Sequence, residues 1–506
     1  MAFNFAHRQT LRSTIRRVSP TVYPNCAARS LLPVSKQWNG KWAAGYATVA
    51  SEQEVPQGRY WAKIPRWEEL PVDTFLSHSW QMANSIHTVR GLSDLMRSVL
   101  PETIPPQQPL RGKLEYPGVS TPEDFIRSFE VAAKKAPMAF RLSPHVLSVI
   151  NWTDPLNDPV RRQFVPLDSV INVAHPAGIF DPLHEVDNSP VRGVIHRYSN
   201  KALFMATSIC PVYCRFCFRS YSVGTETEAV KKMRFLPLMK QWAPKFEYIE
   251  STPSLHDIVI SGGDTYLLEP EQIAYLGDRL LNTPHIKRFR FATKGLGVSP
   301  SRLIDPKDSW IDTVIELSKR GRKMGKEVCV HTHINNKQEI SWITRQGAQR
   351  LYEEGVIVRN QSVLLNGVNN TFDQLRDLVH ALSELHIEPY YVYQGDIVRG
   401  AEDLRTPLSD SHELELQIRD QTAGFLIPRF VYDVPGPAGK RPSLSAQNYD
   451  RRLGVAEFTA PRLNGDYVKY WDPLWSLSED AQEEVQSYFA ERSNDQASAQ
   501  MASVGA

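Results

Sequence analysis

Short apolar segments alternate with longer amphipathic segments along the chain from about residue 200 onward. The short apolar segments predict buried strands at 202–208, 257–261, 288–293, 326–332, 356–365 and 388–394. Between them lie segments with apolar residues at helical spacing, as in 271–281, 310–320 and 372–385. Strands that alternate with helices form a parallel sheet, so the pattern predicts an α/β fold, a partial (β/α)6 barrel that is open on one side. Ligands of such barrels gather at the C-terminal ends of the strands.

The pattern differs on the N-terminal side of this barrel, which we place at residues 186–400. Residues 51–185 carry apolar positions three and four apart, most clearly over 75–100, and predict an N-terminal helical region. Thr121, followed by Pro122 and two acids, is typical of a helix start.

Beyond the barrel, residues 401–480 are predicted to form a separate C-terminal region. An apolar run at 426–433 indicates one further strand there. The tail 481–506 is mostly polar with small side chains, and we expect it to be disordered.

Charge is distributed unevenly over the 506 residues, although the net charge is only +2. The first 51 residues contain seven Lys or Arg and no acid, which leaves 51 Lys/Arg against 56 Asp/Glu in the remainder. Arginine-bearing, acid-free N-termini are typical of mitochondrial transit peptides, so residues 1–50 are interpreted as a transit peptide that directs the chain to the matrix. The alternative is a basic nucleic-acid arm, but the acidic remainder offers it no supporting patch. No apolar run is long enough to span a bilayer, and neither nucleic acid nor a membrane is an expected partner.

Three cysteines form the strongest candidate site. Cys210, Cys214 and Cys217 have C-x3-C-x2-C spacing in a loop that directly follows the first predicted strand. Three thiolates can hold a [4Fe-4S] cube by three irons and leave the fourth iron open to a ligand that is not protein. Zinc is the alternative, but structural zinc requires four ligands and no fourth cysteine lies nearby. Five cysteines in 506 residues do not indicate a disulfide scaffold.

The cysteine spacing and its position after a strand resemble the radical S-adenosylmethionine (SAM) enzymes, in which SAM occupies the open iron. Gly262, Gly263 and Asp264 end the second predicted strand, one βα unit later. By itself this triplet is most simply an ordinary turn, because glycine pairs are common there. In this context it resembles the radical SAM element that contacts the methionine amino group.

Lys440 ends a Gly/Pro-rich loop that follows the last predicted strand. In most proteins such a lysine is an exposed surface charge. A lysine can also condense with the aldehyde of pyridoxal 5'-phosphate (PLP). The cofactor's phosphate would then need cations, which Arg197 and Lys201 could supply from just before the first barrel strand.

Taken together, these motifs resemble the lysine 2,3-aminomutase family, in a mitochondrial, eukaryotic form. The resemblance is collinear from about residue 80 to residue 440. It rests on Asp181-Pro-Leu-His-Glu185, Ser189-Pro190, His196-Arg197-Tyr198, Arg219, Asn360-Gln361-Ser362, Asp396, Arg405-Thr406-Pro407, Asp433 and Lys440.

The resemblance implies an isomerase that moves the amino group of L-lysine from C2 to C3 and produces β-lysine. Its cofactors would be a [4Fe-4S] cluster, SAM and PLP, and its partners an electron donor and other copies of the chain in a homo-oligomer. The cysteines would bind the cluster, Lys440 would bind PLP, and Arg197 and Lys201 would meet the PLP phosphate. Arg219 would bind the substrate carboxylate, and Asp396 and Asp433 would bind its distal ammonium.

Two carboxylates buried together repel each other, so we expect the pKa of either Asp396 or Asp433 to be raised. The chain also departs from the family pattern. Pro437 and Ala438 interrupt a loop that is usually all glycine, and Lys201 stands where an arginine is usual. The chain has no cysteine after Cys329, so the structural zinc of bacterial relatives is not expected. The alternatives are arginine or a protein-bound lysine as substrate, or a non-catalytic iron–sulfur or zinc protein.

Overall fold

The fold centres on a nine-stranded sheet whose spatial order follows the sequence order, β1 to β9, in a computed structural model that describes residues 58–111 and 113–504. The predicted transit peptide lies outside these residues. Strands β2 to β8 are parallel to one another, whereas β1 and β9 pair antiparallel at the two edges. The strands are β1 Val194–Ile195, β2 Lys201–Thr207, β3 Asp257–Gly262, β4 Arg288–Thr293, β5 Glu327–Thr332, β6 Val358–Val363, β7 Glu388–Tyr393, β8 Arg429–Val434 and β9 Gly439–Pro442.

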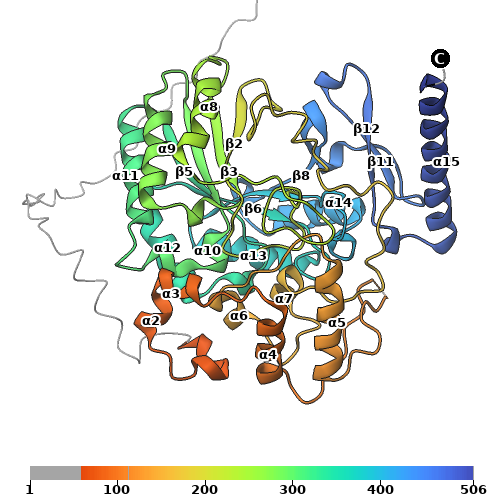
Figure 1. Cartoon of the computed structure of the whole chain (residues 1–506), viewed down its shortest axis with the longest axis horizontal. Helices are drawn as coiled ribbons and strands as arrows, with labels where there is room; N and C mark the ends of the chain where they lie inside the picture. Colours follow the sequence, from red (N-terminus) through yellow and green to blue (C-terminus); the bar gives the residue numbers. More distant parts are fainter. Residues whose placement is uncertain (1–57, 112, 505–506) are drawn as a thin grey trace, which may run out of the picture. The chain divides into compact units, whose positions relative to one another are not determined.

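Helices connect the parallel strands and cover one face of the sheet (Figure 1). Because every strand lies beside its sequence neighbour and such crossovers have one hand, the connecting helices pack on the same face and the sheet curls into an open barrel. The largest apolar cluster joins these helices to the outward side chains of the strands. The connecting helices are α8 Met239–Glu250, α9 Pro270–Asn282, α10 Gly295–Val298, α11 Trp310–Lys323, α12 Trp342–Glu353 and α13 Phe372–Glu384.

The predicted partial barrel is confirmed, and all six predicted strands are present. The strand expected at 426–433 belongs to the same sheet as a seventh parallel strand, because β8 pairs with β7. Lys440 therefore lies on β9, antiparallel to β8, at the edge of the barrel. The sequence pattern could not show this, since the long connection between β7 and β8 looks like the start of another region.

The N-terminal region packs around its own apolar cluster, which also includes Val298 and Ile343 of the barrel. Thr121 begins α5 as predicted, and the structure adds a capping box with Asp124. Residues 165–193 contain no helix, in contrast to the mainly helical region expected up to 185. The helices are α2 Val72–Leu76, α3 His78–Ala83, α4 Val89–Val99, α5 Pro122–Lys135, α6 Pro144–Val149 and α7 Pro159–Phe164.

After the barrel, helix α14 (Leu408–Gln417) precedes β8, and a second sheet of three antiparallel strands follows β9. Its strands are β10 Gln447–Asp450, β11 Val455–Thr459 and β12 Tyr467–Trp471.

Helix α15 (Glu479–Val504) lies beside β11 and β12 (Figure 1). We expected residues 481–506 to be disordered, but residues up to 504 belong to this helix. Ala481 and Val485 anchor that helix in an apolar cluster with Tyr470, because its first turns carry an apolar face that the polar composition hides. No helix in residues 58–111 and 113–504 has the length and apolar character needed to cross a membrane.

Candidate functional site

One cavity of about 340 Å³ collects all the residues predicted to carry chemistry. It opens on the inner face of the curled sheet, where alternate strand residues point inward. The predicted residues that line it are Arg197, Lys201, Cys210, Cys214, Cys217, Arg219, Gly262, Gly263, Asp264, Asp396, Asp433 and Lys440.

The cysteine loop leaves the C-terminal end of β2, where barrel ligands are expected. Cys210, Cys214 and Cys217 are partly exposed toward the cavity. Burial raises the pKa of all three thiols, that of Cys214 to about 12. Bare thiolates are therefore unfavourable here, whereas bound metal deprotonates a coordinating thiol outright.

The donor set of the cysteine loop fits an iron–sulfur cluster with one open iron. In residues 58–111 and 113–504 no set of three or more His, Cys, Asp or Glu is grouped to hold a metal ion. A cubane cluster differs from such a site in that each thiolate binds a different iron, so its ligands do not converge on one point.

The Gly262-Gly263 pair lets the end of β3 approach the cysteine loop. A Cβ atom on Gly262, whose φ is +112°, would lie 2.4 Å from the Thr207 carbonyl oxygen. On Gly263 it would lie 2.5 Å from the carbonyl oxygen of Ile209, the residue before Cys210. The glycines therefore have a packing role in addition to the ligand contact expected of them.

Asp264 is buried and engaged with the backbone. Its carboxylate accepts hydrogen bonds from the backbone N–H groups of Tyr266, at 2.8 Å, and Lys294, at 2.7 Å. Burial raises its pKa, and these hydrogen bonds oppose the increase. Asp264 thus joins the end of β3 to the end of β4 at the cavity wall.

Lys440 and Asp433 face each other across the β8–β9 hairpin, where they are paired in register. The Lys440 Nζ lies 2.6 Å from an Asp433 carboxylate oxygen and 3.4 Å from the Tyr198 hydroxyl. Although burial opposes both charges, the ion pair raises the pKa of Lys440 well above its usual value and lowers that of Asp433. The seven residues that separate Asp433 from Lys440 in the sequence are therefore the span of one hairpin.

The hairpin loop keeps glycine at the two positions that need it. Gly436 and Gly439 both have a φ of +67°. Pro437 and Ala438 lie between them without positive φ and form a short 3-10 turn. The departure from an all-glycine loop is therefore compatible with the backbone, because the substituted positions do not require glycine.

Arg197 holds the base of this hairpin. It lies 3.1 Å from Asp433, and its guanidinium donates to the backbone carbonyls of Val434 and Gly436, the latter at 2.8 Å. Lys201 lies nearby, with its Nζ 3.7 Å from the centre of the Tyr198 ring. Burial and the positive charges of Lys440 and Arg290 lower the pKa of Lys201 to about 8.

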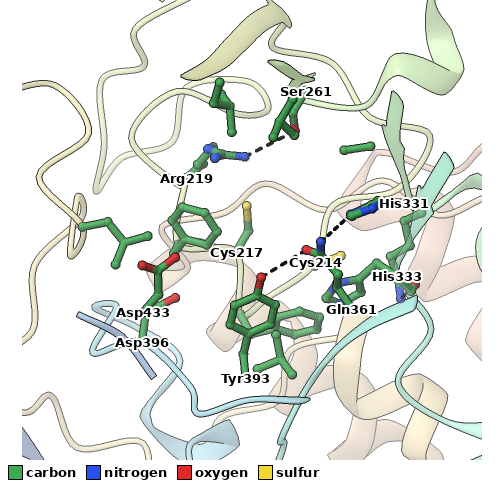
Figure 2. A pocket seen from close by; sticks show the side chains of 18 of the residues that line it. Cys214, Cys217, Arg219, Ser261, His331, His333, Gln361, Tyr393, Asp396 and Asp433 are labelled. Carbon is green, nitrogen blue, oxygen red and sulfur yellow. Dashed lines mark hydrogen bonds between the residues drawn. The ribbon is translucent and has the colours of Figure 1, made fainter. Parts of the chain in front are cut away.

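Asp396 has the raised pKa expected for one member of the carboxylate pair. Figure 2 shows Asp396 and Asp433 close together at the cavity wall. Burial and the charge of Asp433 raise the pKa of Asp396 to about 8, whereas Arg197 and Lys440 lower it. Asp433 keeps its charge because it, unlike Asp396, contacts both cations directly. The sequence indicated both cations as site residues but not that they contact Asp433.

Arg219 forms an ion pair with Glu185, a residue for which the sequence predicted no role. Its Nε and Nη2 form a bidentate pair with the Glu185 carboxylate at 2.8 and 2.7 Å. The Tyr221 hydroxyl donates to the same carboxylate at 2.9 Å. The Nη1 of Arg219 lies 3.4 Å from the Ser261 hydroxyl (Figure 2). Glu185 thus occupies the edge of the guanidinium formed by Nε and Nη2. By holding that edge, it fixes the direction in which Nη1 points.

Further polar side chains on the inner face of the barrel were missed. His331 of β5 and Gln361 of β6 are hydrogen bonded at 2.7 Å, and the Tyr393 hydroxyl of β7 donates to Gln361 at 3.2 Å. His333 stacks with Phe216, with 5.7 Å between ring centroids. Alternation along the strands is the signal that could have placed His331, Gln361 and Tyr393 inside the barrel, because successive strand residues point to opposite faces of the sheet.

Comparison with curated proteins identifies the family. The chain is 33% identical over 395 residues to the L-lysine 2,3-aminomutase of Clostridium subterminale, which covers 78% of this chain and 84% of the relative. It is also 33% identical over 392 residues to the L-lysine 2,3-aminomutase of Acetoanaerobium sticklandii, covering 75% and 84%. A relative named glutamate 2,3-aminomutase, from Clostridioides difficile, is 27% identical over 368 residues, covering 73% and 76%.

The other two comparisons add little. No protein-family model matches the chain. Among solved structures, Streptococcus suis SuiB bound to S-adenosylmethionine is 15% identical, with a TM-score of 0.33 and coverage of 46% of this chain and 50% of that one. This likeness is too weak to support a conclusion.

Proposed function

Because the chain belongs to the lysine 2,3-aminomutase family, we propose that it is a radical SAM isomerase that moves the amino group of L-lysine from C2 to C3. The observation that carries this proposal is the shared cavity: the three-cysteine loop, Lys440 and the pair Asp396 and Asp433 all line it. A single reaction space with thiolates, an amine and two acids matches the chemistry that the reaction requires.

The residues divide the three cofactors among them. The three cysteines hold the cluster, Gly262, Gly263 and Asp264 lie next to it for SAM, and Lys440 binds PLP with Arg197 and Lys201 toward its phosphate. When bound, the cluster and SAM supply the hydrogen-abstracting chemistry, and PLP supplies the aldehyde that holds the amino group during its migration. The protein orients these groups and keeps water out of the barrel interior.

Asp396 and Asp433 select the distal end of the substrate. In the free protein, Lys440 neutralises Asp433 across the hairpin, and the raised pKa of Asp396 keeps that carboxyl largely protonated at neutral pH. A substrate ammonium can take the place of the Lys440 charge and of the Asp396 proton. It then stabilises both groups as carboxylates. A distal carboxylate, as in glutamate, would be repelled at this position. The carboxylate pair therefore favours lysine over the substrate named for the Clostridioides difficile relative.

Arg219 binds the carboxylate of the amino acid through its free edge. Glu185, which itself accepts a hydrogen bond from Tyr221, holds the other edge, so the guanidinium is oriented before the substrate arrives. Arg219 and the two acids are contributed by different strands and loops, and the two ends of a zwitterionic amino acid with a cationic side chain would meet opposite charges.

We further propose that the enzyme acts in the mitochondrial matrix, as a homo-oligomer supplied with electrons by a partner protein. The basic, acid-free first 51 residues support the location. The cluster supports the electron donor, because each one-electron cleavage of SAM requires a reduced cluster.

The test is anaerobic turnover by the full chain. The protein is reconstituted with iron, sulfide and PLP, then given SAM, dithionite and L-lysine, and products are identified by mass spectrometry. We expect β-lysine that depends on both SAM and PLP. Parallel reactions with L-arginine, L-glutamate and a lysine-containing protein substrate test the specificity. SAM cleavage without β-lysine would overturn the substrate assignment, and the absence of any SAM cleavage would overturn the reaction class.

A further inference from the structure

Lys232 is a buried cation next to the cysteine loop, and the proposed function gives it no role. It lies on the irregular segment between β2 and α8 and is 7% exposed. Its Nζ donates hydrogen bonds to two backbone carbonyls, that of Pro137 at 2.8 Å and that of Ser220. Among the described residues, no carboxylate forms an ion pair with it. Because a buried lysine is rarely left without a partner charge, this ammonium indicates an anion nearby.

Ser220 connects Lys232 to the cysteine loop. Its carbonyl accepts the hydrogen bond from Lys232, and its backbone N–H donates to the Cys217 carbonyl at 3.1 Å. The segment that carries Lys232 is held against the loop, because the Met233 N–H donates to the Tyr221 carbonyl at 2.9 Å. The ammonium is therefore fixed one hydrogen-bonded turn away from a predicted cluster ligand.

The charges of Lys232 and Cys217 act on each other. Burial raises the pKa of the Cys217 thiol, whereas a backbone hydrogen bond from Arg219 and the charges of Arg219 and Lys232 oppose this increase. Burial lowers the pKa of Lys232 to about 8, and the charge of Cys217 opposes that decrease. The anion that Lys232 meets is therefore a thiolate that would hold the cluster.

Two other cations near the cysteines differ from Lys232, because an acid pairs with each of them. Lys294, whose charge also acts on the cysteine loop, lies 2.7 Å from Glu339. Arg219 lies 2.7 Å from Glu185. Each of these pairs is neutral as a whole, whereas Lys232 brings a net positive charge to the loop.

We propose that the Lys232 ammonium stabilises the reduced state of the cluster and so raises its reduction potential. The inference rests on the proposed function, because it assumes that the three cysteines hold a [4Fe-4S] cluster. Reduction adds one electron from the donor to an already anionic set of core and thiolates, and no bond or proton has to move. A fixed positive charge favours the more negative state, and the charge around a cluster is one determinant of its potential.

The alternative is a purely structural role, since the same hydrogen bonds hold the backbone of the cysteine loop. The two roles differ in what the loss of the charge would change. Loss of a structural contact lowers the cluster content of the protein. Loss of an electrostatic contact moves the reduction potential and leaves the cluster content as it was.

The experiment measures the reduction potential of the cluster in the full-length protein, reconstituted with iron and sulfide. An anaerobic titration with dithionite and redox mediators is followed by the electron paramagnetic resonance signal of the reduced cluster, and iron and sulfide analysis gives the cluster content. Lys232→Gln removes the charge but keeps N–H donors, and Lys232→Arg keeps the charge.

Lys245→Gln is the matched control. Lys245 is also buried without a carboxylate partner among the described residues. Its Nζ donates to the Met205 carbonyl and lies 5.0 Å and 5.1 Å from the ring centres of Phe204 and Phe235, and no thiol charge acts on it. Its loss should therefore leave the potential at the wild-type value.

We expect the ratio of reduced to oxidised cluster in Lys232→Gln to fall about tenfold at a given potential, a shift of about 59 mV toward negative values for a one-electron couple. Lys232→Arg should stay close to wild type, and the cluster content should be the same in all the proteins. An unchanged potential in Lys232→Gln, an equal shift in Lys232→Arg, or loss of the cluster from Lys232→Gln would overturn the inference. Wild-type protein that takes up no [4Fe-4S] cluster would instead remove the proposed function itself, so the two failures are distinguishable.

Discussion

At the scale of the residue, Asp433 and Asp396 differ in whether a cation contacts their carboxylate. Asp433 contacts Lys440 and Arg197 and keeps a lowered pKa. Asp396 has neither contact, and burial beside Asp433 raises its pKa to about 8. Two aspartates that look equivalent in the sequence are therefore charged differently before a substrate binds.

Replacing Asp396 tests this difference through the pH dependence of stability. Between its ordinary pKa, about 3.9, and 8, the folded chain keeps a proton that the unfolded chain has released. The stability associated with that proton is complete below about pH 4 and is lost as pH rises through 8. We expect the Tm of the PLP-free wild type to fall more between pH 6 and pH 9 than that of Asp396→Asn.

The same variant should lose affinity for lysine. Removing one of two carboxylates should raise the KM for lysine at pH 8 by at least about tenfold. In the wild type, KM should fall as pH rises toward 8, because the carboxyl ionises while the lysine ammonium stays charged. Parallel Tm curves for the two proteins, together with an unchanged KM, would contradict the assignment.

At the scale of the element, the β8–β9 hairpin brings the amine and the acid together. Its register pairs Asp433 with Lys440, and its loop needs two glycines with positive φ. Gly439, with φ +67° and ψ −162°, occupies a region that is essentially restricted to glycine. A Cβ atom there would also lie 2.7 Å from the Tyr198 ring. Both the conformation and the space exclude a side chain next to Lys440.

Gly439→Ala should therefore damage the hairpin and the cofactor site together. We expect about 1–3 kcal/mol of lost stability from the backbone alone, and reduced PLP linkage because Tyr198 and Lys440 are displaced. Ala438→Gly changes the adjacent residue without introducing a Cβ atom and should keep PLP linkage. Chemical denaturation and PLP titration measure the two effects, and a Gly439→Ala protein with wild-type PLP affinity would refute the argument.

At the scale of the whole molecule, the curl of the sheet brings residues near its two edges to one cavity. The cysteine loop follows β2, the first parallel strand, whereas Lys440 lies on β9 at the opposite edge. More than two hundred residues separate them in sequence, yet both line one cavity. The cysteines and the PLP-linking lysine thus share a space but lie on different elements.

This separation predicts that each cofactor can be removed without the other. Lys440→Ala should abolish the absorbance of lysine-linked PLP and leave the iron and sulfide content unchanged. Cys214→Ala should lose the cluster and keep the PLP linkage. Both variants should lose β-lysine formation. Full lysine-linked PLP absorbance in Lys440→Ala would show that another amine, such as that of Lys201, binds the cofactor.

The sequence by itself determined the local structure and the identity of the reactive groups. Strands of period two and helices of period 3.6 leave patterns within a few residues, so the six predicted strands match β2 to β7 closely. The cysteine spacing and the glycine-rich approach to Lys440 are equally local. These features required no knowledge of distant contacts.

Only the tertiary structure decided which groups meet. It placed the strand before Lys440 inside the barrel as β8 and paired Glu185 with Arg219. It also showed that Asp433, and not Asp396, receives the cations. Such pairings depend on strand register and on inward-facing side chains from segments far apart in the chain, and the hydrophobic pattern of any single segment does not contain that information.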